Sequence, residues 1–234
     1  MRFDAIAFDL DGTLYPAYSL FLRAAPSMVV RAARLAAYNA VRVEMRAQGV
    51  AIDAALRDRG EAADEVPARS EVEFRQEQAK AFARRCGMSE PEAAAYIEKR
   101  FTREIEELFA RIKPFRGAAA ALDALAAEGL RLAVLSDLPP RRKLELLGLE
   151  GRFEFALCSE ESGYLKPARA PFELLERNLG LGPERILYVG NSPKIDLGAK
   201  AAGMAAAIVS RHKVPGADFV FYNWNDLVTF ALGD

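Results

Sequence analysis

Apolar residues follow two different periods along the chain, and the change between them divides the sequence into two parts. Residues 4–10 (DAIAFDL) form a short apolar run that ends in acidic residues, which is typical of a buried strand. From about residue 18 to residue 113, apolar residues instead recur at helical spacing among arginines, alanines and glutamates. This second pattern predicts a block of amphipathic helices directly after the first strand.

Polar residues interrupt the helical block once. The stretch 57–70 (RDRGEAADEVPARS) predicts a loop between helices. Helices are expected to resume at about 71–86 and at 89–111, where Ser89 is suited to the N-cap and Pro91 to the first turn.

After Pro114, short apolar runs alternate with helical segments. Strands are predicted at 131–136, 153–159, 185–190, 204–209 and 217–222. Helices are predicted at 117–128, 140–147, 171–179, 194–202 and 225–232. Such alternation is typical of parallel βαβ units. The sequence therefore predicts an α/β fold, with a doubly wound, mainly parallel sheet built from residues 1–16 and 114–234 and an all-helical cap domain at 17–113.

Composition narrows the range of partners. The 234 residues contain 32 Lys and Arg against 33 Asp and Glu, so charge balance gives no reason to expect nucleic acid or an anionic membrane surface. Cys86 and Cys158 belong to no metal or redox motif and are expected to be reduced thiols. No apolar run approaches the roughly 18 to 20 residues that span a bilayer. We expect a cytoplasmic protein that acts on a small molecule, as a monomer or a homodimer.

The strongest chemical pattern is Asp9-Leu10-Asp11-Gly12-Thr13-Leu14, directly after the first predicted strand. On an extended strand Asp9 and Asp11 would face the same way, and Gly12 would let the chain turn sharply. Carboxylates held this close favour a bound cation or a shared proton. Because open α/β sheets bind ligands at the carboxyl ends of their strands, we prefer a functional site to a solvated Asp-Gly turn.

Together with three later segments, this motif resembles the haloacid dehalogenase (HAD) superfamily. Ser136 ends an apolar strand, and Lys166 is followed by proline and a helix. A fourth strand leads into Asn191 and Asp196, and then into Ala-Gly-Met at 202–204. Either Ser136 or Lys166 alone would carry no information, but the four segments occur in the superfamily's order and span nearly the whole core.

The resemblance implies a phosphatase chemistry. Asp9 would attack phosphorus to form an aspartyl-phosphate, and Asp11 would protonate the leaving oxygen and then activate water. Ser136 and Lys166 would hold the phosphoryl oxygens, and backbone N–H groups around residues 10–12 would extend that cradle. The expected catalytic residues are Asp9, Asp11, Ser136 and Lys166. The expected substrate contacts are Gly12, Thr13, Ser136, Asp137 and Lys166.

The resemblance also implies Mg²⁺ as cofactor, held by the Asp9 carboxylate, the main-chain carbonyl of Asp11, Asn191 and Asp196, directly or through water. Asn191 departs from the pattern, since phosphatases of the superfamily usually carry Asp there. Its amide oxygen can bind Mg²⁺ but adds no charge, so we expect weaker metal affinity. Asp196 would compensate through a metal-bound water or by orienting Lys166.

Asp137 is the second departure, because Asn is common after the serine in relatives. Its carboxylate would either select a cationic or hydroxylated substrate group or cap the following helix. Both alternatives stay open. In the cap, most arginines are expected to form a solvated helix face. Tyr15 and Tyr18 would contact substrate or pack against the cap.

Two function classes compete with the phosphatase. Asn191 favours a 2-haloacid dehalogenase-type hydrolase, which needs no metal, whereas Asp11 favours a phosphatase because an alkoxide leaving group needs a proton and a halide does not. A non-catalytic binding protein on the same scaffold is the other alternative. The sequence therefore predicts a Mg²⁺-dependent phosphomonoester hydrolase that acts on a small metabolite phosphate. Near the C-terminus, Phe219, Phe221 and Trp224 are expected to pack in the core rather than form a dimer contact.

Overall fold

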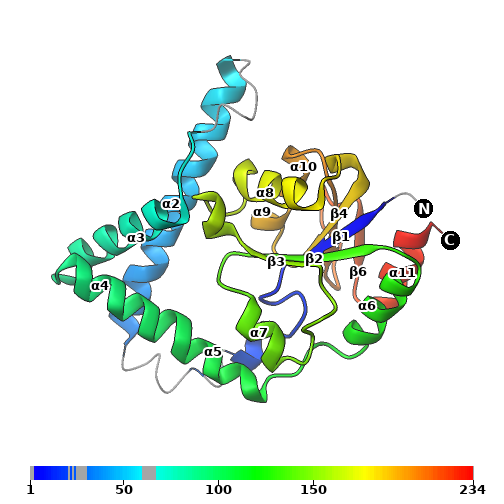
Figure 1. Ribbon diagram of the computed structural model, residues 1–234, viewed down its shortest axis with the longest axis horizontal. Coiled ribbons are helices and arrows are strands. Elements are labelled where there is room, and N and C mark those ends of the chain that lie inside the picture. Colours follow the sequence, from blue (N-terminus) through cyan, green and yellow to red (C-terminus); the bar gives the residue numbers. More distant parts are fainter. Residues whose placement is uncertain (1–2, 21, 23, 25–30, 60–66, 234) are drawn as a thin grey trace.

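The computed structural model describes residues 3–20, 22, 24, 31–59 and 67–233 (Figure 1). Six parallel strands form one sheet in the order β3-β2-β1-β4-β5-β6. They are β1 (Ala5–Phe8), β2 (Arg131–Ser136), β3 (Phe155–Cys158), β4 (Ile186–Gly190), β5 (Ala205–Val209) and β6 (Phe219–Phe221). The chain adds strands on one side of β1 and then on the other. The carboxyl end of β1 therefore lies where the strand order reverses, which is the ligand-binding position of open α/β sheets.

The two faces of β1 explain its unbroken run of apolar residues. Ile6 and Phe8 belong to one buried cluster, and Ala5 and Ala7 belong to another. Helices α6 (Ala118–Ala127) and α11 (Trp224–Leu232) cover the first face, and α8 (Arg169–Leu179), α9 (Pro193–Asp196) and α10 (Gly198–Ala201) cover the second (Figure 1). Because both faces of the strand are buried, every one of its positions is apolar.

The C-terminal aromatic residues pack as the sequence indicated. Phe221 and Trp224 are buried in the cluster around Phe8, and the ring of Phe219 stacks on Phe230 at 4.2 Å.

A group of helices lies on one side of the sheet, away from both chain ends (Figure 1). It contains α2 (Ala32–Arg59), α3 (Glu71–Cys86), α4 (Glu90–Ile97), a π-helical segment (Glu98–Arg103) and α5 (Glu104–Leu108). These helices bury their own aromatic cluster around Tyr38, Phe82 and Phe101. Ser89 caps α4 in a capping box, and Ser70 caps α3 in the same way. The α/β class with a parallel sheet is confirmed, and the domain limits at 17–113 stay a prediction.

Three predicted segments differ from the structure, and two of them lie before residue 114. The predicted loop 57–70 begins too early, because α2 continues to Arg59; residues 60–66 lie outside the described residues. The predicted helix 89–111 is divided by the π-helical segment at Glu98–Arg103 and closes in a 3₁₀ turn at Phe109–Arg111. A π-helical turn is wider than an α-helical one and shifts which side chains share a face, so helical periodicity does not reveal it.

The predicted helix 194–202 is split into α9 and α10. Gly198 begins α10, and a Cβ there would lie 2.6 Å from the carbonyl oxygen of Pro167. The loop that carries Lys166 and Pro167 therefore approaches the backbone directly at this point. Within the described ranges, none of the helices combines the length and hydropathy that crossing a lipid bilayer requires.

Candidate active site

Asp9 follows β1 and lies at the centre of the site. Its backbone N–H donates to Val189 O at 2.8 Å, which ties this end of β1 to β4. One carboxylate oxygen accepts from Lys166 Nζ at 2.8 Å, and the other accepts from Thr13 Oγ1 at 2.9 Å. Burial raises the pKa of the Asp9 carboxyl to about 7, with Lys166 acting in the opposite direction. These two hydrogen bonds fix the direction of the carboxylate, and Asp9 is only 7% exposed.

Lys166 is buried among oxygen atoms on the loop that precedes α8. Its Nζ lies 2.8 Å from Asp9, 3.2 Å from Asp196 and 2.7 Å from the hydroxyl of Tyr188. Burial alone would lower the pKa of Lys166, but Asp9, Tyr188 and Asp196 hold it well above its usual value. The ammonium group thus carries its charge next to the candidate nucleophile.

Asp196 organises the loop after β4. One of its oxygens contacts Lys166, and the other accepts the backbone N–H groups of Asn191 at 3.0 Å and Ser192 at 2.8 Å. A Cβ at Gly190 would lie only 2.2 Å from the Asp196 carboxyl carbon, so this close approach requires glycine. Because both carboxylate oxygens are engaged within the protein, Asp196 supports Lys166 and the loop directly.

Asn191 lies against the loop that carries the DxDGT motif. Its Oδ1 is 3.3 Å from Thr13 Oγ1, the same hydroxyl that donates to Asp9. Gly12 has φ 93°, and a Cβ there would lie 2.4 Å from Asn191 Nδ2. Both the positive φ of the turn and the close packing of the two loops therefore require glycine at position 12.

Asp11 has partners that the motif does not reveal. Its carboxylate accepts from Lys143 Nζ at 2.7 and 2.9 Å and from the Tyr15 hydroxyl at 2.7 Å. Lys143 is a nearly buried residue of α7 (Arg141–Leu146), and its Nζ also lies 5.3 Å from the centre of the Phe109 ring. Tyr15 packs edge-to-face on the same ring, whereas Tyr18 is 68% exposed. Of the two tyrosines, Tyr15 packs and also fixes Asp11.

A cavity of about 430 Å³ lies between this end of the sheet and α2. In the part of the chain that the structure describes, six of the predicted site residues line it: Asp9, Asp11, Asp137, Lys166, Asn191 and Asp196. Gly12, Thr13 and Ser136 are predicted site residues that do not line it. Ser136 is fully buried at the end of β2, and its Oγ accepts from Leu138 N at 3.4 Å.

Two arginines of α2 enter the cavity and contact the core. Arg42 is buried and pairs with Glu160 at 2.6 Å, while also donating to the carbonyl oxygen of Asp137 at 2.5 Å. Arg46 pairs with the Asp137 carboxylate at 2.7 Å. They are exceptions to the expected solvated face, and no motif marks them.

Asp137 does not cap the following helix, so that alternative is wrong. Helix α7 follows Pro140 as its N-cap, and no side chain caps it. The Asp137 carboxylate instead binds Arg46 and accepts from Lys166 N at 3.3 Å. Burial would raise the pKa of Asp137, but Lys166, Arg46 and Arg42 together hold it below its usual value. The ion pair between the Asp137 carboxylate and Arg46 therefore joins α2 to the core.

The donor atoms around Asp9 suit a hard cation such as Mg²⁺, which prefers oxygen ligands. The available oxygens are the Asp9 carboxylate and the Asn191 amide oxygen, with the Asp11 main-chain carbonyl expected beside them. Among the described residues, no three His, Cys, Asp or Glu side chains gather as a metal site. Of the two side chains, Asp9 would bring a negative charge to a cation and Asn191 would bring none, and the metal affinity stays a prediction.

The parallel sheet and the buried Asp9–Lys166 pair at the carboxyl end of β1 define an α/β protein with a candidate active site where the strand order reverses. The chain matches the sequence profile of the haloacid dehalogenase-like hydrolases over residues 3–203. The protein therefore belongs to the haloacid dehalogenase-like hydrolase family.

Curated relatives include both phosphatases and dehalogenases. A glyceraldehyde 3-phosphate phosphatase of Methanopyrus kandleri is 32% identical over 220 residues, which cover 89% of this chain and 84% of that protein. Haloacetate dehalogenase H-2 of Moraxella sp. is 33% identical over 111 residues, which cover 46% of this chain and 50% of that protein. The chain spans about half the length of the first curated relatives that it matches.

Solved structures show the same fold in both branches. An L-2-haloacid dehalogenase from Xanthobacter autotrophicus with chloropropionic acid covalently bound gives a TM-score of 0.64 at 20% identity and covers 99% of both chains. A HAD phosphatase from Thermococcus onnurineus gives 0.61 at 20% identity and covers 98% of both chains. At this identity the likeness concerns the fold alone.

Proposed function

We propose that the protein is a Mg²⁺-dependent phosphomonoester hydrolase that acts on a small metabolite phosphate through an aspartyl-phosphate at Asp9. The observation that carries this proposal is the carboxylate of Asp11, which lines the same cavity as Asp9. An alkoxide leaves phosphorus readily only when it is protonated, whereas a halide ion leaves carbon without a proton. A second carboxyl group beside the nucleophile therefore favours phosphate esters over haloacids.

In this proposal a carboxylate oxygen of Asp9 bonds to phosphorus while the bond from phosphorus to the alcohol oxygen breaks. Asp11 gives its proton to that oxygen. Water then loses a proton to Asp11 and attacks phosphorus, and the bond between phosphorus and Asp9 breaks. Lys166 holds the Asp9 carboxylate and carries positive charge towards the phosphoryl oxygens. Mg²⁺, when bound, neutralises charge between the two anions.

The contact with Lys143 and Tyr15 defines a resting position for Asp11. Lys143 Nζ contacts both oxygens of the Asp11 carboxylate, at 2.9 and 2.7 Å. Asp11 must therefore turn from Lys143 towards the leaving oxygen to act as an acid, which makes Lys143 a positioning residue in this proposal.

The proposal extends to the substrate class, the cellular compartment and the oligomeric state. A phosphoglycolate phosphatase of Rhodospirillum rubrum is 37% identical over 99 residues and, with the Methanopyrus protein, supports a small phosphate ester. We further propose a cytoplasmic monomer or homodimer without nucleic-acid or membrane partners. The free thiols of Cys86 and Cys158 are consistent with a reducing compartment.

A parallel assay tests the phosphatase against the dehalogenase. Purified protein is incubated with Mg²⁺ and a panel of phosphomonoesters, and separately with 2-chloropropionate. The proposal expects release of inorganic phosphate and no release of chloride. Chloride release without phosphate release would assign the chain to the dehalogenase branch, which Asn191 and the relative from Moraxella support.

Replacing Asp11 with asparagine is expected to slow hydrolysis of alkyl phosphates by about 10²- to 10⁴-fold, the usual contribution of a general acid–base group. p-Nitrophenyl phosphate should lose less, because its leaving group needs little help from a proton. The measurement is kcat for the two ester types in both proteins. Equal losses on both esters would remove Asp11 from the proton-transfer role.

Changing Asn191 to aspartate is expected to tighten Mg²⁺ binding by about tenfold or more, because it adds a negative charge beside Asp9. Titration of activity with Mg²⁺ measures the change. Asn225→Asp adds the same charge at an exposed position of α11 and should leave the titration unchanged. Weaker or unchanged binding in Asn191→Asp would place residue 191 away from the metal.

A further inference from the structure

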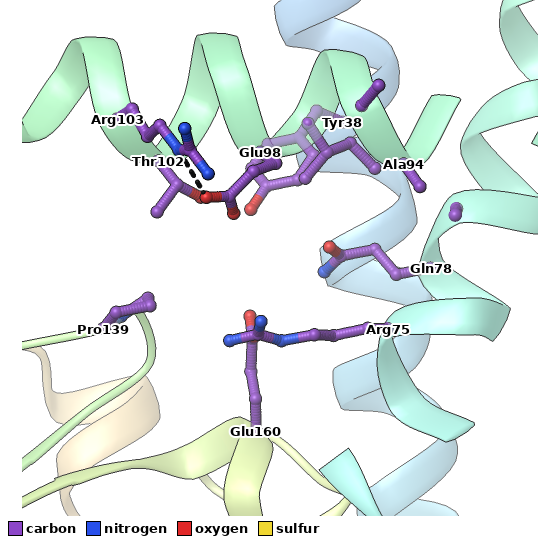
Figure 2. A pocket seen from close by; sticks show the side chains of 12 residues that line it. Tyr38, Arg75, Gln78, Ala94, Glu98, Thr102, Arg103, Pro139 and Glu160 are labelled. Atoms are coloured by element: carbon purple, nitrogen blue, oxygen red, sulfur yellow. Dashed lines mark hydrogen bonds and ion pairs between the residues drawn. The ribbon is translucent and has the colours of Figure 1, made fainter. Parts of the chain in front are cut away.

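A second cavity of about 450 Å³ lies beside the active site, between the helices of the cap and the core (Figure 2). Tyr38 lines both cavities. The neighbouring loop residues Leu138 and Pro139 line one cavity each. Between the cavities, Arg42 donates to the Tyr38 hydroxyl at 3.3 Å and pairs with Glu160 at 2.6 Å. The two spaces therefore share a wall.

Gln78 of α3 points into this second cavity (Figure 2). Its side chain is only 3% exposed, and its amide Nε2 is buried without a hydrogen-bond partner among the described residues. A buried donor without a partner destabilises a fold, and an apolar side chain of similar size would avoid that loss. An unpartnered amide donor aimed into a cavity points to a ligand with an oxygen atom that accepts its hydrogen bond.

The remaining wall has both polar and apolar parts but no excess charge. Arg75 faces Glu160 at 3.4 Å, and Arg103 pairs with Glu98 at 2.8 Å (Figure 2). Small and apolar side chains complete the wall, namely Ala79, Ala94, Ala95, Ile97 and Pro139. Because each arginine is matched by a glutamate, the cavity has no surplus charge for a second anionic group. It suits a neutral group with apolar and hydrogen-bonding faces.

The π-helical segment Glu98–Arg103 forms part of this wall through Glu98, Thr102 and Arg103. Turns of this kind occur often at functional sites because they redirect side chains that a regular helix would place elsewhere. Thr102, which lies beside Arg103 and Glu98, is a further polar residue of this wall (Figure 2). The π-helical segment therefore adds polar side chains to the wall of the cavity.

We propose that this cavity binds the alcohol part of the substrate, and that the substrate is the phosphate monoester of a neutral, sugar-sized polyol. This inference rests on the proposed phosphatase function. The phosphoryl group lies at Asp9, and the polyol extends over the wall formed by Tyr38, Arg42 and Glu160. A ring or chain hydroxyl oxygen accepts the hydrogen bond from Gln78 Nε2. The cavity volume falls within the range of small-molecule sites, and its matched charges disfavour a carboxylate-bearing ester.

The test compares kcat/KM for hexose and pentose phosphates with kcat/KM for 2-phosphoglycolate. Wild-type protein should prefer at least one sugar phosphate. Gln78→Met keeps the length of the side chain but removes the donor, and it should lower that preference about tenfold, mainly through KM. Its melting temperature should hold or rise, because an unpaired amide is lost. Gln76→Met, at an exposed position of the same helix, should change neither quantity.

Two outcomes would overturn the inference: a wild-type preference for 2-phosphoglycolate over every sugar phosphate, or an unchanged preference in Gln78→Met. If Gln78→Met does not fold, Gln78→Leu provides the same comparison. Failure of the proposed function looks different, because wild-type protein would then not hydrolyse p-nitrophenyl phosphate either.

Discussion

Asparagine in place of Asp9 is expected to abolish phosphate-ester hydrolysis, with a loss in kcat of about 10⁴-fold or more, as for other covalent nucleophiles. The amide is a poor nucleophile and cannot form the aspartyl-phosphate. The Thr13 hydroxyl keeps an oxygen acceptor at this position, and Lys166 keeps its contact with Asp196. The protein should therefore stay folded. Hydrolysis of p-nitrophenyl phosphate and thermal unfolding by circular dichroism measure the two quantities.

The matched control for this variant is Asp226→Asn, at an exposed position in the first turn of α11. It makes the same chemical change far from the cavity and should retain full activity. Turnover by a folded Asp9→Asn protein at more than a small fraction of the wild-type rate would remove Asp9 from the nucleophile role.

Replacing Lys166 with methionine is expected to remove activity and to lower the free energy of unfolding by about 3–5 kcal/mol. Lys166 is 1% exposed, and its ammonium group lies between two buried carboxylates, Asp9 and Asp196. Without it, these negative charges stay buried without a cation between them. Urea unfolding followed by circular dichroism measures the loss of stability, and phosphate release measures the loss of activity.

Two further variants separate charge from packing at Lys166. Lys194→Met removes an exposed lysine of α9 and should change stability little. Adding Asp196→Asn to Lys166→Met removes one of the unpaired charges and should recover part of the stability without activity. If Lys166→Met unfolds within about 0.5 kcal/mol of wild type, the buried charge arrangement described for Asp9 and Asp196 is incorrect.

The core of the fold could be predicted because its strands have a simple physical pattern. Both faces of β1 are buried, so its residues form an unbroken apolar run that ends at Asp9. The carboxyl ends of parallel strands meet at one edge of the sheet. Motifs at the ends of predicted strands are therefore expected to converge, and the structure brings Asp9, Lys166 and Asn191 to one cavity.

The contacts made by the cap could not be predicted in the same way. Arg42 and Arg46 lie on a helix with many other arginines, and their burial depends on how α2 packs against Asp137 and Glu160, more than 90 residues away in sequence. Helical periodicity identifies a helix but does not place it on the sheet.

Lys143 illustrates a signal that sequence analysis missed. It follows two arginines, a composition typical of exposed helices, yet it neighbours Leu144 and is almost fully buried. Its position one turn before Leu147 indicates the inward face of α7. The partner that makes its burial tolerable, Asp11, lies 132 residues earlier in the chain.

The most direct test of the account is to identify the group that Asp9 carries during turnover. Protein that is hydrolysing a phosphomonoester in the presence of Mg²⁺ is quenched in acid, digested and examined by mass spectrometry. If Asp9 is the nucleophile, the peptide that contains it carries a phosphoryl group, and the same peptide from Asp9→Asn carries none. An unmodified Asp9 peptide during sustained turnover, or a phosphoryl group on another residue, would contradict it.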